Sequence, residues 1–248
     1  MPFQNKVALV TGSGSGIGEA TAKRLSREGA TIVVADVDSQ GGERVVKEIN
    51  AEGGQAAFVQ TDVSDEQQTE AMVQFAVDTF GGLHLAVNNA GFGEAPSPMH
   101  QLEPSVFDRV IAVDLKGVWL CMRAELAHFV NNGGGAIVNT ASGAGLKAVP
   151  GLTAYTAAKH GVVGLTRTGA IDYIKQDIRI NAVAPGAVTT PLLLSQAKEQ
   201  IAAISALMPT GRVARPEEIA AGIVWLLSDE ASYVTGTILE IDGGFMQA

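Results

Sequence analysis

The chain is poor in the residues that crosslink a protein or bind a metal. Its 248 residues include a single cysteine, Cys121, so no intrachain disulfide can form and a reducing compartment is allowed. Cys121 lies in an apolar run and is predicted to be helix interior rather than a reactive thiol. The 4 histidines are scattered without metal-ligand spacing, so we expect no metal site.

Long hydrophobic runs and basic clusters are also missing. No apolar stretch approaches the roughly 20 residues that a membrane helix needs, and the first residues lack the pattern of a signal peptide. The 17 Lys and Arg residues are outnumbered by 26 Asp and Glu, for a net charge of −9. Because phosphates bind clustered basic side chains, we expect a cytoplasmic protein that binds neither nucleic acid nor membrane.

Short apolar runs alternate with helical stretches along almost the whole chain. This alternation predicts a doubly wound α/β fold with a parallel sheet and helices on both faces. The predicted strands are 6–10, 31–35, 55–60, 84–88, 135–140, 178–183 and 237–241. The predicted helices are 17–28, 40–52, 65–80, 104–130, 153–175, 192–207 and 216–228. With no linker and no repeat, residues 1–248 are predicted to form one domain. Ser64 and Gln67 fit a capping box for the third helix.

A glycine-rich turn follows the first predicted strand and leads into a helix. Glycines allow a ligand to approach the backbone closely, and the helix N-terminus offers free N–H groups to a pyrophosphate. Turns of this kind also occur without ligands, so the turn alone does not establish a site. The residues predicted to contact a dinucleotide here are Gly12, Ser15, Gly16, Ile17 and Gly18.

The second predicted strand leads into Asp36 and Val37, which are predicted to contact the cofactor. A carboxylate at this place can accept hydrogen bonds from both hydroxyls of an adenosine ribose, and it would repel a 2′-phosphate. We therefore predict NAD in preference to NADP. The alternative for Asp36 is a solvated strand end.

Tyr155 and Lys159 are four positions apart, so on a helix they share one face. Tyrosine has an ordinary pKa of about 10, but an ammonium about 4 Å away favours the phenolate by roughly 4 kcal/mol at an effective dielectric near 20. Such a tyrosine can exchange a proton with an alcohol or a ketone. Ser142, beyond the strand predicted at 135–140, could hydrogen-bond the same oxygen. Taken alone, the pair could equally be two solvated side chains.

Together these motifs resemble the short-chain dehydrogenase/reductase family over essentially the whole chain. The matching motifs are Thr11-Gly-x-x-x-Gly-x-Gly18, Asp62-Val63, Asn88-Asn-Ala-Gly91, Ser142, Tyr155-x-x-x-Lys159, Pro185-Gly186 with Thr190, and Asp242-Gly-Gly244. The resemblance implies a Rossmann fold with a seven-stranded parallel sheet in the order 3-2-1-4-5-6-7. It also implies an NAD-dependent oxidoreductase that interconverts a secondary alcohol and a ketone, with Tyr155 as general acid/base.

The resemblance implies roles for further residues. Lys159 would bind the nicotinamide ribose as well as adjusting Tyr155, and Thr190 with the Val188 backbone would hold the carboxamide. The remaining cofactor contacts that it implies are Asp62, Val63, Asn89, Ala90, Gly91, Pro185 and Gly186.

The chain departs from the family pattern at Asp114, where relatives usually carry Asn. In relatives that Asn is thought to hold a water that links the Lys to solvent. A carboxylate near Lys159 would offset part of its effect on Tyr155, so we expect slower turnover or a higher pH optimum. The alternative is that Asp114 serves only the local helix geometry.

Two irregular segments, 92–99 and 187–211, are predicted to form the substrate pocket, the second as a lid. Their apolar side chains favour a hydrophobic or cyclic small-molecule alcohol or ketone; the alternative is that the lid helix simply packs on the core. The candidate substrate contacts are Ser142, Ala144, Leu146, Leu152, Tyr155 and Leu192.

The stretch 106–122 is apolar nearly all round, and 157–170 is rich in small residues. We predict a subunit interface there, in a homotetramer or a homodimer; tight packing inside the monomer is the alternative. Two functional alternatives also stay open: an NAD(H)-binding sensor or scaffold with little turnover, and a lyase or epimerase that uses NAD transiently. A hydrolase is disfavoured because Ser142 lacks the nucleophile-elbow motif.

Overall fold

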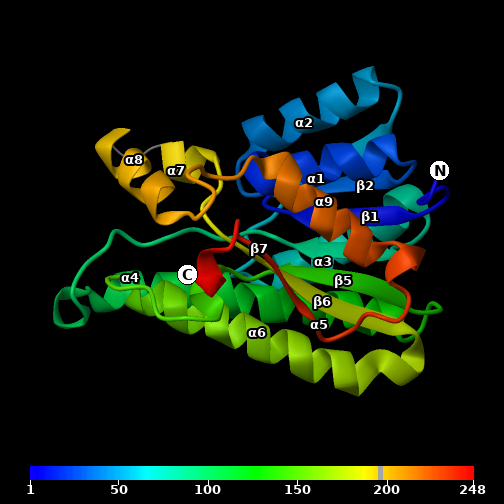
Figure 1. The fold of residues 1–248 in the computed structure, drawn as a ribbon. Helices are drawn as coiled ribbons and strands as arrows, with labels where there is room; N and C mark the ends of the chain where they lie inside the picture. The colour runs from blue at the N-terminus through cyan, green and yellow to red at the C-terminus, as the bar shows by residue number, and fades with distance from the viewer. Residues whose placement is uncertain (195–197) are drawn as a thin grey trace.

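The computed structural model describes residues 1–194 and 198–248, which form a parallel sheet between two layers of helices (Figure 1). The strands are β1 (Val7–Thr11), β2 (Thr31–Asp36), β3 (Gln55–Gln60), β4 (Leu85–Asn88), β5 (Gly135–Thr140), β6 (Ile178–Pro185) and β7 (Ile238–Ile241). They lie in the order β3-β2-β1-β4-β5-β6-β7, and every pairing is parallel. The predicted fold class and strand order are confirmed.

The helices divide between the two faces of the sheet. One face is covered by α1 (Gly16–Arg27), α2 (Ser39–Ala51) and α9 (Pro216–Leu227), and the other by α3 (Glu66–Phe80), α5 (Val118–Phe129) and α6 (Thr153–Tyr173). Three more lie toward the carboxyl ends of the strands: α4 (Pro104–Ile111), α7 (Pro191–Leu194) and α8 (Lys198–Leu207) (Figure 1). Among the described residues, no helix is long and apolar enough to cross a membrane.

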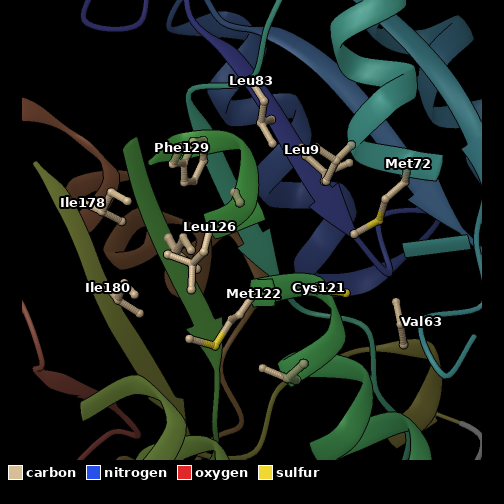
Figure 2. Close-up of a cluster of buried hydrophobic side chains, with 14 of the residues drawn as sticks. Leu9, Val63, Met72, Leu83, Cys121, Met122, Leu126, Phe129, Ile178 and Ile180 are labelled. Atoms are coloured by element: carbon tan, nitrogen blue, oxygen red, sulfur yellow. The ribbon is translucent and has the colours of Figure 1, made fainter. Parts of the chain in front are cut away.

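An apolar cluster fills the space on each side of the sheet. Along β1, Leu9 enters one cluster while Ala8 and Val10 enter the other, which explains why the strands are continuous apolar runs. Figure 2 shows Leu9, Met72 and Phe129 gathered with their neighbours between the strands and α3, α5 and α6. Each such fully buried side chain stabilises the fold by about 1.5–3 kcal/mol. The sheet is therefore a rigid base for the loops at its carboxyl edge.

The stretch predicted as one helix over 104–130 is interrupted. A π-helical turn, Ala112–Gly117, separates α4 from α5, and it carries the buried side chain of Asp114. Single π turns inside helices rotate the residues that follow and are frequent at functional sites. The hydrophobic pattern of the sequence does not indicate a π turn. Such a turn inserts one residue into the helix, and the apolar positions continue on both sides of it.

The predicted capping box at Ser64 and Gln67 is wrong. Asp65 is the N-cap of α3, and its carboxylate accepts hydrogen bonds from the backbone N–H groups of Gln67 and Gln68. The Ser64 hydroxyl is already occupied, because it donates to Asp62 at 2.7 Å. An aspartate in extended conformation one residue later fills the same role.

A polar network is buried between α5 and the sheet. Glu125 is fully buried, and its Oε2 accepts a hydrogen bond from Asn88 Nδ2 at 3.0 Å. The Asn88 amide also donates to Asn139, which donates in turn to Thr166 at 2.9 Å. Burial raises the pKa of Glu125 to about 8, because the hydrogen bond from Asn88 offsets only part of the lost hydration. Cys121 is buried nearby, as predicted for helix interior.

We predict that Glu125 makes the fold less stable as the pH rises. Its pKa is raised from 4.5 to about 8 on folding, so the folded chain holds this proton more tightly than the unfolded chain does. The resulting stability is full below pH 4.5 and is lost as the pH rises through about 8. Glu125→Gln, which cannot ionise, should flatten the dependence of the unfolding midpoint on pH between 5.5 and 9.

The measurement is urea unfolding across that pH range, with the exposed Glu103→Gln as the matched control. The control should follow the parent. Parallel curves for Glu125→Gln and the parent would show that Glu125 does not titrate in this range.

Candidate active site

A cavity of about 510 Å³ opens at the carboxyl edge of the sheet, between the glycine turn and α6. Its volume suits a small-molecule ligand. The predicted site residues that line it are Gly12, Ser15, Gly16, Ile17, Asp36, Val37, Asp62, Val63, Asn89, Ala90, Gly91, Asp114, Tyr155, Lys159 and Thr190. Residues spread along most of the chain thus meet in one hollow.

The glycine turn leaves no room for side chains. A Cβ on Gly12, whose φ is +62°, would lie 2.7 Å from the Ala90 Cα, and one on Gly18 would lie 2.2 Å from the Gly12 carbonyl oxygen. Asn89 fixes the turn by donating from its amide to the carbonyl oxygens of Thr11 and Gly12, both at 3.1 Å. The cavity floor is therefore bare backbone, which a phosphate group can approach closely. Gly18 itself packs beneath the turn and does not line the cavity.

Asp36 is held at the rim of the cavity and is not a solvated strand end. Its Oδ2 accepts a hydrogen bond from the Gly14 N–H at 2.7 Å. The guanidinium of Arg44 reaches the same turn, where it donates to the Gly14 carbonyl at 2.9 Å. Arg44 is also paired with Glu19 and Glu48, so two carboxylates offset its charge. The edge of the cavity beside Asp36 is therefore acidic.

Lys159 lies at the other end of the cavity and is almost completely buried. Its Nζ donates to the Thr140 carbonyl at 3.1 Å, lies 3.3 Å from Asp114 Oδ1, and is 5.4 Å from the centre of the Tyr155 ring. Asp114 Oδ2 accepts a hydrogen bond from the Phe92 N–H at 3.2 Å. Asp114 is therefore an ion-pair partner of Lys159, and its side chain does more than serve helix geometry.

Burial and charge act in opposite directions on this pair. Burial raises the pKa of Asp114, and the Lys159 ammonium and the Phe92 N–H offset only part of that rise. Burial is the largest single effect on Lys159 and disfavours its ammonium, but Asp114 and Tyr155 together outweigh it, so the pKa of Lys159 is raised. Lys159 therefore stays cationic, while Asp114 ionises less readily than an exposed aspartate.

The comparisons with known proteins agree with this geometry. The family model for enoyl-(acyl carrier protein) reductase matches residues 12–246. Cyclohexanol dehydrogenase of Acinetobacter sp. (strain SE19) is 45% identical over 243 residues, covering 98% of this chain and 96% of the relative. The chain belongs to the short-chain dehydrogenase/reductase family. The predicted family and enzyme class, a short-chain alcohol dehydrogenase or ketoreductase, are confirmed.

Solved structures of family members superimpose over nearly the whole chain. The crystal structure of levodione reductase matches with a TM-score of 0.95 and 40% identity, covering 99% of both chains. A 3-ketoacyl-(acyl-carrier-protein) reductase from Brucella melitensis, complexed with NADH, matches with a TM-score of 0.92 and 38% identity, covering 98% of this chain and 99% of that one. The family thus binds a nicotinamide cofactor on this fold.

Of the predicted substrate contacts whose side chains the structure describes, Tyr155 lines the cavity, whereas Ser142, Ala144, Leu146 and Leu152 lie outside its lining. The Ser142 hydroxyl lies at the end of the β5 loop and accepts a hydrogen bond from the Ala144 N–H at 3.1 Å. Ala144 is buried, Leu146 packs against the core, and Leu152 is the residue before α6. Leu192 lies in α7, but its side chain is outside the described part of the structure.

Three predicted cofactor contacts of the short-chain dehydrogenase/reductase motifs also lie away from the cavity lining: Pro185, Gly186 and Val188. The Gly186 N–H donates to the Ile241 carbonyl at 3.1 Å, and Val188 bridges to Ala214. These residues support the loop that brings Thr190 to the cavity.

Phe92 and Pro191 come from the two segments predicted to form the substrate pocket. The lining residues that the sequence did not indicate are Thr61, Ser64, Arg109, Ala112, Val113 and Thr140. Thr61 and Ser64 flank the Asp62-Val63 motif, so their place could have been found. Arg109 could not: it comes from α4 and lies over the Phe92 ring at 4.9 Å, a contact that depends on tertiary packing. Among the described residues, no three His, Cys, Asp or Glu side chains gather as a metal site.

Proposed function

We propose that this protein is an NAD-dependent oxidoreductase that interconverts a secondary alcohol on an apolar cyclic molecule and the corresponding ketone. The observation that carries the proposal is the buried Lys159 ammonium facing the Tyr155 ring, in the same cavity that the glycine turn lines. The names of cyclohexanol dehydrogenase and levodione reductase favour a cyclic substrate.

The residues of the cavity fit a dinucleotide. The bare backbone at Gly12 would hold the pyrophosphate, Asp62 and Val63 the adenine, and Thr190 the carboxamide end. The Asp36 carboxylate would accept the ribose hydroxyls and repel a 2′-phosphate, which supports NAD. When bound, the nicotinamide supplies or accepts a hydride at the substrate carbon.

Tyr155 would transfer the proton to or from the substrate oxygen. Lys159 is fixed by the Thr140 carbonyl and Asp114, so its ammonium remains beside the Tyr155 ring and stabilises negative charge on the phenol oxygen. Tyr155 would then take a proton from an alcohol or give one to a ketone, while Ser142 would hold the same oxygen by a hydrogen bond.

We propose that the segment 187–211, in which 195–197 lie outside the described residues, covers this site as a lid. Thr190 and Pro191 already line the cavity, while Leu194 and Leu207 are exposed on α7 and α8. The continuous sheet supports a single domain over 1–248, and the cytoplasmic location stays a prediction.

The test of the proposed function is a panel of cyclic and acyclic secondary alcohols and ketones, assayed with NAD(H) and with NADP(H). We expect kcat/KM for cyclohexanol-type substrates to be about tenfold or more higher with NAD, because like charges repel at Asp36. Tyr155→Phe should lower kcat/KM by about 10²- to 10⁴-fold, with NADH binding by fluorescence unchanged.

Other outcomes identify the alternatives. NADH binding without turnover on the whole panel would favour a sensor or scaffold. Product formation without net cofactor turnover would favour a lyase or epimerase. A Tyr155→Phe variant as fast as the parent would remove Tyr155 from the chemistry.

A second prediction concerns Asp114. Its carboxylate offsets part of the effect of Lys159, so Asp114→Asn should let the ammonium act fully on Tyr155. We expect kcat at neutral pH to rise, because the ammonium then stabilises negative charge on the phenol oxygen without an opposing carboxylate. The measurement is kcat against pH, with Asp108→Asn, an exposed carboxylate on α4, as control. An unchanged profile for Asp114→Asn would make the carboxylate neutral for catalysis.

We also propose a homotetramer, although Gly161 and Gly169 in α6 are not evidence for it. A Cβ on Gly161 would meet Leu115 at 2.6 Å, and one on Gly169 would meet Ile180 at 3.0 Å, so close packing inside the monomer accounts for both glycines. The support comes from exposed apolar side chains on both faces of the molecule.

Those side chains predict two separate interfaces, as a symmetric tetramer requires. Trp119 on α5 and Ile171 on α6 are exposed on one face, and Trp225 on α9 is exposed on the other. Light scattering should give about four times 25.6 kDa. Trp119→Glu and Trp225→Glu should each halve that mass. In a homodimer, only one of the two variants would change the mass.

A further inference from the structure

A buried carboxylate touches the backbone of Tyr155 from a distant part of the chain. Glu94 lies in the segment that follows β4 and is only 9% exposed. Its Oε1 accepts a hydrogen bond from the Tyr155 N–H at 3.2 Å. Its Oε2 is shielded from solvent and has no hydrogen-bond partner among the described residues. The bond to Tyr155 is thus the polar contact that holds this carboxylate.

Glu94 supplies a cap that α6 does not provide for itself. The helix begins at Thr153, and its N-cap residue, Leu152, has no side chain that can accept a hydrogen bond. The first N–H groups of a helix have no partners within the helix, and a carboxylate there is favoured by the helix dipole. The N–H that Glu94 binds belongs to the residue whose phenol the proposed chemistry uses.

The segment that carries Glu94 is tied to the site at both ends. The Phe92 N–H donates to Asp114, the ion-pair partner of Lys159. The Ser97 N–H donates to the Gly151 carbonyl, just before α6, at 3.0 Å. Glu94 sits between these two anchors, so the segment and the start of α6 are held as one unit.

Stability alone does not explain a glutamate at this position. A carboxylate that is buried with one oxygen unpaired costs stability. A Ser or Asp at the N-cap position would satisfy the helix without burying a charge brought from another segment. The cost of burying Glu94 is explained if its contact fixes the position of Tyr155 relative to the segment that carries Glu94.

We propose that Glu94 is a positioning residue for Tyr155: it caps α6 from the predicted substrate segment and fixes the Tyr155 backbone for proton transfer. The inference rests on the proposed function, because Tyr155 is the proton donor and acceptor there. In this proposal Glu94 acts by accepting the hydrogen bond from the Tyr155 N–H, and its negative charge is not required.

Two variants separate these roles. Glu94→Gln keeps an acceptor oxygen and removes the charge, whereas Glu94→Met keeps the volume and removes the acceptor, so that the core stays filled. Glu103→Gln and Glu103→Met are the matched controls, since Glu103 is exposed at the start of α4 and makes no side-chain cap.

The first readout is hydrogen exchange of the amides in 153–156, which does not depend on activity. Glu94→Met should speed exchange there by about tenfold and leave the rest of α6 unchanged, because one hydrogen bond is lost locally. The second readout is kcat with the best substrate of the panel. It should fall about tenfold in Glu94→Met and stay within about twofold in Glu94→Gln, with the NADH dissociation constant unchanged in both.

The outcomes separate this inference from the proposed function. Normal exchange or full activity in Glu94→Met would overturn the positioning role. Loss of activity in Glu94→Gln as large as in Glu94→Met, with a displaced pH profile, would overturn it in favour of a charge effect. If the parent had no activity on any alcohol, faster exchange in Glu94→Met would still support the cap on Tyr155, while the proposed function would fail.

Discussion

The site depends on keeping one ammonium group out of water. Burying the Lys159 amine costs several kcal/mol unless hydrogen bonds and an opposite charge replace its hydration. The structure supplies both: the Thr140 carbonyl at the end of β5 and the Asp114 carboxylate in the π turn. These partners come from separate elements, so the cation is correctly placed only when the sheet, the π turn and α6 are all assembled.

The buried ion pair of Lys159 and Asp114 also restricts the backbone that packs around it. A Cβ on Gly91 would lie 2.5 Å from Asp114 Oδ1 and 3.5 Å from Lys159 Nζ, so the loop after β4 can approach the ion pair only as glycine. The same logic holds at Gly12 and Gly18, where the glycine turn meets the loop that carries Ala90. Both ends of the cavity are therefore shaped by close backbone contacts that the two apolar clusters hold rigid.

The sequence predicted what depends on local pattern and failed where distant segments decide. Buried strands such as Thr31–Asp36 follow from apolar runs, and the cofactor side of the cavity follows from the glycine turn and the motifs in order. The π turn Ala112–Gly117 and the place of Arg109 do not, because both are set by packing between elements. On the substrate side, the structure brings Tyr155 into the cavity lining together with Phe92 and Pro191 from the two predicted pocket segments, while the substrate contacts themselves stay a prediction.

Buried carboxylates show why residue type alone does not assign a role. Glu125 accepts a hydrogen bond from the neutral amide of Asn88, so burial dominates and its pKa rises to about 8. Asp114 is equally buried but faces Lys159, so part of the same cost is recovered as an ion pair. Glu94 faces a helix N-terminus and accepts one N–H. Glu125 is a structural group, Asp114 adjusts the charge of Lys159, and Glu94 holds the backbone of Tyr155. Each role follows from the partner that the fold places opposite the carboxylate, which is why it becomes visible only once the chain is folded.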